Sequence, residues 1–295
     1  MCIRDRHFGV TASVADDKTE VTKWTYNTKI PSYGATGWWD KSAYKEGMVL
    51  GDIWGLQFDR FLTEDDFNAD GSLKAGLPDQ TKVFPAGYQF APGDVLYKDL
   101  DNNGEIVKQT NTNDKGDLSV IGNALPRLQF GLNLDAAWKG FDISMFFQGV
   151  AKRKLWAAGN QVLPGFTTGE PFYKGAEDYW TPENTDAFYP RPMDYKQSAS
   201  GNYSVNDRYL LNMAYLRLKT FTVGYSLPKV WLSKFKVQGL RVYFTGENLF
   251  TIDGVKPAID PEIGIRTASG KSDQRNFGRS YPYQKTVSFG IQLSL

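Results

Sequence analysis

A short run from Asp99 to Glu105 comes closest, in residue type and spacing, to a pattern with a known chemistry. It reads Asp-Leu-Asp-Asn-Asn-Gly-Glu, so oxygen-bearing side chains recur at Asp99, Asp101 and Asn103. Hard oxygen ligands at alternate positions can face a common ion, and Gly104 permits the sharp turn that this requires. The spacing is that of the first half of an EF-hand-type calcium loop.

The second half of that loop does not fit the pattern as well. Its twelfth position, where a carboxylate is expected, is Thr110, and Asp117 is the nearest acidic candidate, across an apparent insertion. The candidate calcium ligands are therefore Asp99, Asp101, Asn103, Glu105 and Asp117. The alternative is a solvated turn whose Asp and Asn side chains hydrogen-bond their own backbone.

Aromatic residues are a second group of candidates, because they form 15% of the chain. The candidates for contact with a substrate lie in or beside long polar stretches, where they could stack on sugar rings: Trp38, Trp39, Trp156, Tyr179 and Trp180. The alternative is that these side chains pack within loops or form an interfacial belt.

No group of residues predicts catalysis. The only cysteine is Cys2 and the only histidine is His7, which argues against a disulfide framework, a cysteine metal site and a histidine-dependent triad. The carboxylates are numerous, but no motif pairs them. A net charge of +1 argues against a nucleic-acid partner. We expect no enzymatic activity and no cofactor other than calcium.

The elements that would position these residues are strands, and the closing stretch 285–295 is the clearest. Apolar residues alternate with small or polar ones to the last position: Val287, Phe289, Ile291, Leu293 and Leu295. Such a strand suits a soluble core or an outer-membrane barrel, in which one face meets lipid and the other a polar lumen. In a barrel it is the closing strand and the segment that assembly machinery recognises.

Stretches 128–138 and 141–148 predict a hairpin joined by Lys139-Gly140, with strands of about ten residues, the length that a tilted membrane strand needs. One parity is apolar and is expected to face lipid: Leu132, Leu134, Ile143 and Met145. The other is polar and is expected to face the lumen: Asn133, Asp135 and Ser144. A two-sheet soluble sandwich is the alternative.

Further alternating stretches are 8–14, 52–61, 221–227 and 240–247. From residue 128 onward, the connections alternate between short and long, as in barrels with short periplasmic turns and long extracellular loops. This predicts a periplasmic C-terminus. The direction of strands before residue 128 is not fixed by the pattern. No run approaches the 18 apolar residues of a spanning helix, which argues against a helical membrane protein.

Ordered segments of the chain resemble the SusC/RagA-type TonB-dependent outer-membrane transporters. The segment 46–67 is similar to a glycine-aromatic barrel segment of the family, 92–106 to its Asp-rich loop, and 178–192 to its WTPEN loop. The most specific match is 120–150, and three further matches complete the run: 214–228, 239–252 and 281–295.

The resemblance implies an all-β fold, the C-terminal portion of an antiparallel barrel that has 22 strands in the intact family, without its plug domain. It also implies uptake of an oligosaccharide or a peptide. The implied partners are a SusD-like surface lipoprotein, TonB-ExbB-ExbD acting through the missing plug, and outer-membrane lipid.

The domain prediction has two parts. Residues 1–6 are adapter-like and non-native, and residues 7–295 are a partial barrel. The absence of a signal peptide predicts a fragment whose N-terminal part is missing. The alternative function is a secreted β-rich carbohydrate-binding module.

Overall fold

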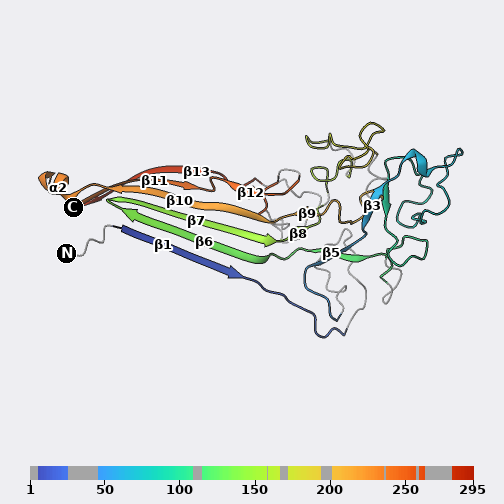
Figure 1. Cartoon of the computed structure of the whole chain (residues 1–295), viewed down its shortest axis with the longest axis horizontal. Helices are drawn as coiled ribbons and strands as arrows, with labels where there is room; N and C mark the ends of the chain where they lie inside the picture. The colour runs from blue at the N-terminus through green and yellow to red at the C-terminus, as the bar shows by residue number, and fades with distance from the viewer. Residues whose placement is uncertain are drawn as a thin grey trace.

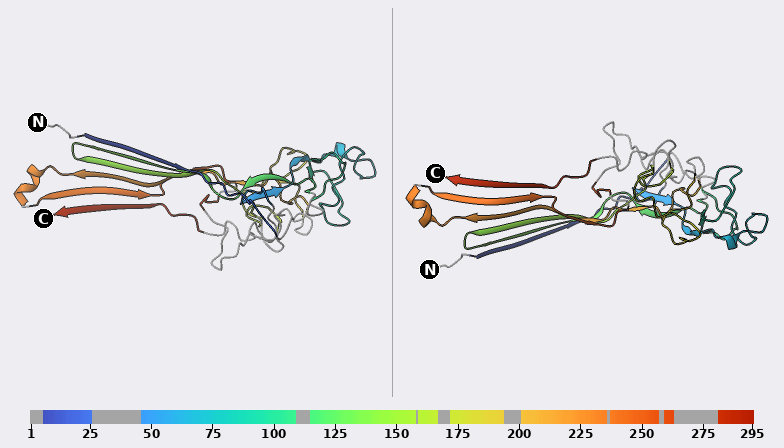
Figure 2. Two further views of the ribbon diagram at one scale, coloured as in Figure 1. Left: turned by 90° about the horizontal axis from the view of Figure 1, so that it is seen from below. Right: turned by 90° about the horizontal axis from the view of Figure 1, so that it is seen from above.

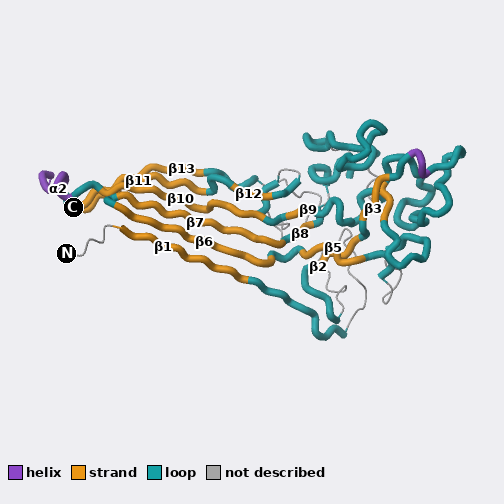
Figure 3. The backbone as a smooth tube through the Cα atoms, viewed as in Figure 1, coloured by secondary structure: helices purple, strands orange, loops and turns teal. Residues whose placement is uncertain are grey.

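The computed structural model describes residues 6–25, 46–108, 115–157, 159–166, 172–193, 201–235, 237–256, 259–262 and 281–295. Strands are the main regular secondary structure of this part of the chain, and the helices are short (Figure 3). None of the helices described is long or apolar enough to cross a membrane.

One seven-stranded antiparallel sheet forms the long body of the molecule (Figure 1). Its main strands follow in this order: β1 (Arg6–Ala15), β6 (Arg127–Trp138), β7 (Phe141–Lys152), β10 (Tyr215–Ser226), β11 (Gly239–Glu247) and β13 (Thr286–Ser294). The short strand β12 (Thr251–Asp253) pairs with the start of β10. The expected strands at 8–14, 128–148, 221–227, 240–247 and 285–295 are all present.

Short and long connections lie at opposite ends of this sheet (Figures 1 and 2). Lys139 and Gly140 make the tight turn between β6 and β7, both with positive φ, as a two-residue hairpin turn requires. The other short connection, between β10 and β11, carries α2 (Lys229–Leu232) and η3 (Ser233–Phe235). The described parts of the long connections gather at the other end, which is called the loop region below.

The loop region has its own small sheets (Figure 3). They pair β2 (Asp52–Gly55) with β5 (Ser119–Asn123), β3 (Phe58–Phe61) with β4 (Val95–Tyr97), and β8 (Lys154–Leu155) with β9 (Leu211–Asn212). A single turn of helix, η2 (Glu64–Asp66), follows β3. Two clusters of buried apolar side chains hold these pieces together.

The stretch 52–61, expected from its alternation and its resemblance to be a barrel segment, is not in the large sheet. It breaks into β2 and β3 around Leu56, which is fully buried and whose N–H donates to the carbonyl of Val205 at 2.9 Å. Gly55 also lies so close to Val205 that a side chain would not fit. Because this alternation faces a local core, and not lipid and lumen, the expectation was wrong here.

Strand β1 removes the uncertainty about direction before residue 128, because it runs antiparallel to β6 along its whole length. Its first residue, Arg6, pairs with Trp138. Strand β10 carries a β-bulge: Leu218 pairs with Phe147 and Thr220 with Phe146, so Lys219 is the extra residue. The bulge keeps Leu218 and Phe221 on the same face of the sheet.

Candidate functional site

One face of the large sheet is a continuous apolar surface. The register places Leu134 between Val10 of β1 and Met145 of β7, and Met145 beside Phe221 of β10. In the neighbouring row, Val223 of β10 pairs with Phe244 of β11, and Phe244 pairs with Phe289 of the last strand. The side chains of the central strands are half-buried by their neighbours, and Phe8 and Phe289 on the two edge strands are 75% and 82% exposed. The face is therefore a surface made for an apolar environment.

The opposite face is mainly polar, although Phe146 also lies on it. Asp135, Ser144, Thr222 and Thr245 follow one another across four adjacent strands. His7 Nε2 lies 2.6 Å from the carboxylate of Asp135. The Thr222 and Thr245 hydroxyl oxygens lie 3.2 Å apart.

A charged pair joins the polar face across β7, β10 and β11. Arg241 donates from Nε to Asp142 at 2.9 Å, passing above Gly224, where a side chain would collide with the guanidinium. The predicted division of the hairpin by parity is confirmed. The apolar face carries Leu132, Leu134, Ile143 and Met145, and the polar face carries Asn133, Asp135 and Ser144.

The closing strand β13 places Val287, Phe289, Ile291 and Leu293 on the apolar face, each more than half exposed. Leu295, 81% exposed, follows the end of the strand. On the polar face, Gly290 lies opposite Tyr243, whose ring covers it and leaves no room for a side chain. Recognition of this strand by assembly machinery stays a prediction.

The predicted substrate-contacting aromatics fall into different environments. Trp38 and Trp39 lie outside the described residues. Trp156 and Trp180 are 3% and 7% exposed and belong to the two buried clusters of the loop region. Trp180 packs directly on Gly93, where a Cβ would lie 2.5 Å from the ring. Of the three described, only Tyr179, 40% exposed, offers a surface to a ligand.

The Asp-rich loop brings three of the predicted calcium ligands together. Carboxylate oxygens of Asp99, Asp101 and Asp117 lie within 4.8 Å of one another. Asp117 is fully buried and accepts hydrogen bonds from the N–H groups of Leu100 at 2.8 Å and Val107 at 2.7 Å. Asp117 is distant from Asp99 in sequence but close to it in space, as a shared calcium site would require.

The other two predicted ligands, Asn103 and Glu105, have hydrogen-bond or ion-pair partners of their own. The Asn103 side-chain oxygen accepts from the N–H of Glu105 at 2.7 Å, and Glu105 pairs with Lys82. Hydrogen bonds from backbone N–H groups, above all that of Gly104, lower the pKa of Asp99. Desolvation, with smaller effects from Asp117 and Asp99, raises the pKa of Asp101. Calcium binding here stays a prediction.

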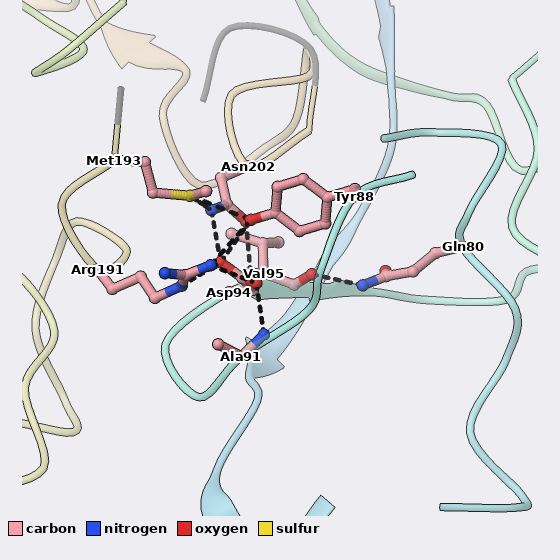
Figure 4. Close-up of polar contacts among 8 residues, drawn as sticks. All are labelled: Gln80, Tyr88, Ala91, Asp94, Val95, Arg191, Met193 and Asn202. Carbon is pink, nitrogen blue, oxygen red and sulfur yellow. Dashed lines mark hydrogen bonds and ion pairs between the residues drawn. The ribbon is translucent and has the colours of Figure 1, made fainter. Parts of the chain in front are cut away.

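Sequence reasoning missed the most connected polar group of the loop region, the fully buried Asp94 (Figure 4). Its Oδ1 accepts from the Tyr88 hydroxyl at 2.9 Å, from Arg191 Nε at 2.8 Å and from Asn202 Nδ2 at 3.0 Å. Its Oδ2 accepts from the Ala91 N–H at 2.9 Å. Burial first, then the negative charge of Asp94, raises the pKa of Tyr88.

Asn202 and Gln80 extend this network along β4. The Val95 N–H donates to Asn202 Oδ1 at 2.8 Å, and Gln80 Nε2 donates to the Val95 carbonyl at 2.8 Å (Figure 4). Three distant parts of the chain, around residues 80–97, 191 and 202, are thereby fixed to one another. The one sequence signal was a carboxylate directly before the wholly apolar Val95–Tyr97.

Comparison with known proteins gives consistent results. No family model matches the chain. The chain is 29% identical to TonB-dependent receptor P3 of Formosa agariphila over 258 residues, 84% of the chain and 22% of the receptor. It is 32% identical to TonB-dependent receptor P26 of the same organism over 200 residues, 66% of the chain and 19% of the receptor.

A third relative is TonB-dependent receptor SusC of Bacteroides thetaiotaomicron, 25% identical over 242 residues, 79% of the chain and 22% of SusC. The chain thus spans about a fifth of the length of the curated relatives that it matches. Solved structures agree on the fold. The RagAB peptide importer in the open-open state matches 99% of the chain and 27% of the solved chain, with a TM-score of 0.62 at 18% identity.

The closed-closed state of the same importer matches with a TM-score of 0.58 at 18% identity, over 99% of this chain and 28% of the other. The two-faced antiparallel sheet and these matches define the class, a segment of a transmembrane β-barrel. With the receptor relatives, they identify the chain as a SusC/RagA-type segment of a TonB-dependent receptor.

Proposed function

We propose that this chain forms part of the wall and the outer loops of an outer-membrane nutrient importer. The observation that carries the proposal is the large sheet, with one apolar and one polar face across strands of 9 to 12 residues. A membrane strand needs about 9 to 11 residues, and a barrel wall needs lipid on one side and a polar lumen on the other.

Uptake is driven through TonB-ExbB-ExbD and the plug of the complete receptor, and the substrate is an oligosaccharide or a peptide. A SusD-like surface lipoprotein is the partner at the outer mouth. The likeness to SusC and to the RagAB peptide importer supports these assignments. The proteins that this chain resembles are named as receptors and importers, so no catalytic step is proposed.

The loop region faces the outside of the cell, and the turn end, with the C-terminus, faces the periplasm. The separation of long and short connections supports this orientation, because barrels of this class keep short turns on the periplasmic side. Thr185 and Trp231 mark the two ends, since both are exposed, Thr185 in the loop region and Trp231 in α2.

The test places single cysteines at these two positions in the complete receptor, after replacing every native cysteine. Whole cells are treated with a membrane-impermeant maleimide before and after the outer membrane is permeabilised. We expect Thr185→Cys to react in intact cells and Trp231→Cys only after permeabilisation. The reverse pattern would show that the orientation is inverted.

Membrane extraction tests the more basic claim. A barrel wall stays with the outer membrane through washes in high salt and carbonate and is released by detergent. Recovery of the receptor in the wash would contradict the barrel and favour a secreted carbohydrate-binding module.

A further inference from the structure

The loop region contains a cavity of about 750 Å³, the size of a small-molecule or short-peptide site. Its described lining comes from residues 164 and 172–179 on one side and from residues 189–192 and 203 on the other. Its aromatic lining residues are Phe172, Tyr173, Tyr179, Tyr189 and Tyr203. Prolines at 164, 190 and 192 complete the apolar part, and Lys174 and Glu177 are its charged lining residues.

The two buried rings of the lining, Tyr189 and Tyr203, form the floor of the cavity and are held in place by contacts within the protein. Tyr189 and Tyr203 are 5% and 4% exposed, and both rings pack on Tyr209. The Tyr189 hydroxyl donates to the Val162 carbonyl at 2.9 Å, a second contact that fixes the ring. A rigid floor lowers the entropic cost of binding.

The wall is exposed, in contrast to the floor. Phe172 and Tyr179 are 60% and 40% exposed. Gly165 has a positive φ, and its missing Cβ would lie 3.6 Å from the Phe172 ring, in ordinary contact. Two exposed rings beside a buried aromatic floor leave an apolar surface that an incoming group can cover.

The lining discriminates between ligand classes. An aromatic ring can cover a sugar ring as well as an apolar side chain, so the charged lining residues decide between the two classes. The cavity offers mostly aromatic and proline surface, with charge only at Lys174 and Glu177, both exposed. Among the described residues, neither forms an ion pair. A short peptide has complementary features: an apolar side chain and two terminal charges of opposite sign.

We propose that this cavity binds a short peptide, with an aromatic or large aliphatic side chain between Phe172 and Tyr179 and its terminal charges at Lys174 and Glu177. The inference rests on the proposed function, because it names the substrate class of the importer. It concerns binding alone, so it can fail while import stands.

The test uses the complete receptor in detergent and isothermal titration with Ala-Phe-Ala, Ala-Ala-Ala and maltotriose. We expect Ala-Phe-Ala to bind about tenfold more tightly than Ala-Ala-Ala, and Phe172→Ala or Tyr179→Ala to remove about that factor. Trp231→Ala is the matched control, an exposed aromatic at the opposite end of the molecule, and is expected to bind as the wild type does. Melting curves establish that each variant is folded.

Equal affinity for the two tripeptides would overturn the inference, as would unchanged binding in both cavity variants. Binding of maltotriose that is lost in those variants would assign the cavity to glycans. A receptor that binds Ala-Phe-Ala in the cavity but supports no import would contradict the proposed function and leave the cavity assignment intact. Import without tripeptide binding would contradict the cavity assignment alone.

Discussion

The large sheet and the loop region differ in which side chains they bury. In the main strands of the sheet, the only buried hydrophobic side chains among those described are Val150, Tyr215 and Leu218, all toward the loop end. The loop region buries two apolar clusters and also fully buries Asp94, Asp117, Gln80 and Asn202. The sheet therefore depends on its surroundings for stability, whereas the loop region carries its own core.

Removing Asp94, the buried carboxylate with the most hydrogen bonds, should give the largest loss of stability. The loss should be confined to the loop region. Asp94→Ala leaves Arg191 without its partner and removes an acceptor from Tyr88 and Asn202. Three donors lose their acceptor, one of them the charged and partly exposed Arg191, which together costs about 3–5 kcal/mol. Hydrogen exchange of the detergent-purified receptor should show faster exchange around 85–97 and 187–193, with β6 and β7 unchanged.

Asp70→Ala is the matched control, because Asp70 is exposed and bonds only within its own turn, to Ser72. It should leave exchange in both regions as in the wild type. Faster exchange in β6 and β7 of the Asp94 variant would show that the two regions do not fold independently.

Adding a charge to the sheet should expose its dependence on surroundings. Leu134→Arg puts a guanidinium on the apolar face and should cost about 2–4 kcal/mol if that face meets lipid near the midplane. Asn133→Arg, one residue away on the polar face, should cost far less. Reversible unfolding in lipid vesicles measures both. Equal costs would argue for a soluble sandwich.

Calcium should act on the loop region only. If Asp99, Asp101 and Asp117 hold the ion, calcium at about ten times its dissociation constant should stabilise the loop region by about 1.4 kcal/mol. Titration calorimetry on the receptor, with Asp101→Ala as the variant and Asp70→Ala as the control, tests this. An affinity that Asp101→Ala leaves unchanged would place the ion elsewhere, and no saturable binding would exclude it.

The smallest loss of stability should come from lowering the pH. Arg60, then the Thr63 backbone N–H, lowers the pKa of Asp66 from 3.8 to about 2, against an opposing effect of burial. Because this pKa is depressed by folding, its stabilisation is present above pH 4 and is lost as the pH falls toward 2. With solvent screening this amounts to about 1 kcal/mol. Asp66→Asn should flatten this part of the pH dependence of loop-region melting.

The sheet could be predicted from the sequence because each strand meets a different environment on each face. Leu132, Leu134 and Met145 therefore alternate with Asn133, Asp135 and Ser144, and the period of two appears directly in the residues. Lys139-Gly140 predicted the hairpin turn. The lengths of the connections predicted that the short turns lie at one end of the sheet and the long loops at the other.

The loop region was harder to predict because its burial is local and its partners are distant in sequence. Asp94 and Asn202 are separated by more than a hundred residues, and no spacing rule joins them. The alternation at 52–61 has the same period as the sheet strands but faces a small core on both sides of Leu56. Packing within loops was the alternative given for Trp156 and Trp180, and the structure has them so, but no spacing rule distinguishes it from ligand contact.

The bulge at Lys219 determines where the length of β10 can change. Anywhere else in the strand, a one-residue insertion or deletion would exchange the lipid-facing and lumen-facing sets beyond it. Deleting Lys219 would remove the residue that has no partner on β7, so Leu218 and Thr220 would keep Phe147 and Phe146. Its cost is the loss of the 2.7 Å contact from Lys219 Nζ to Glu262 and of the 3.1 Å hydrogen bond from the Asn248 N–H to the Lys219 carbonyl. Length variation among homologous strands should therefore concentrate at this one position.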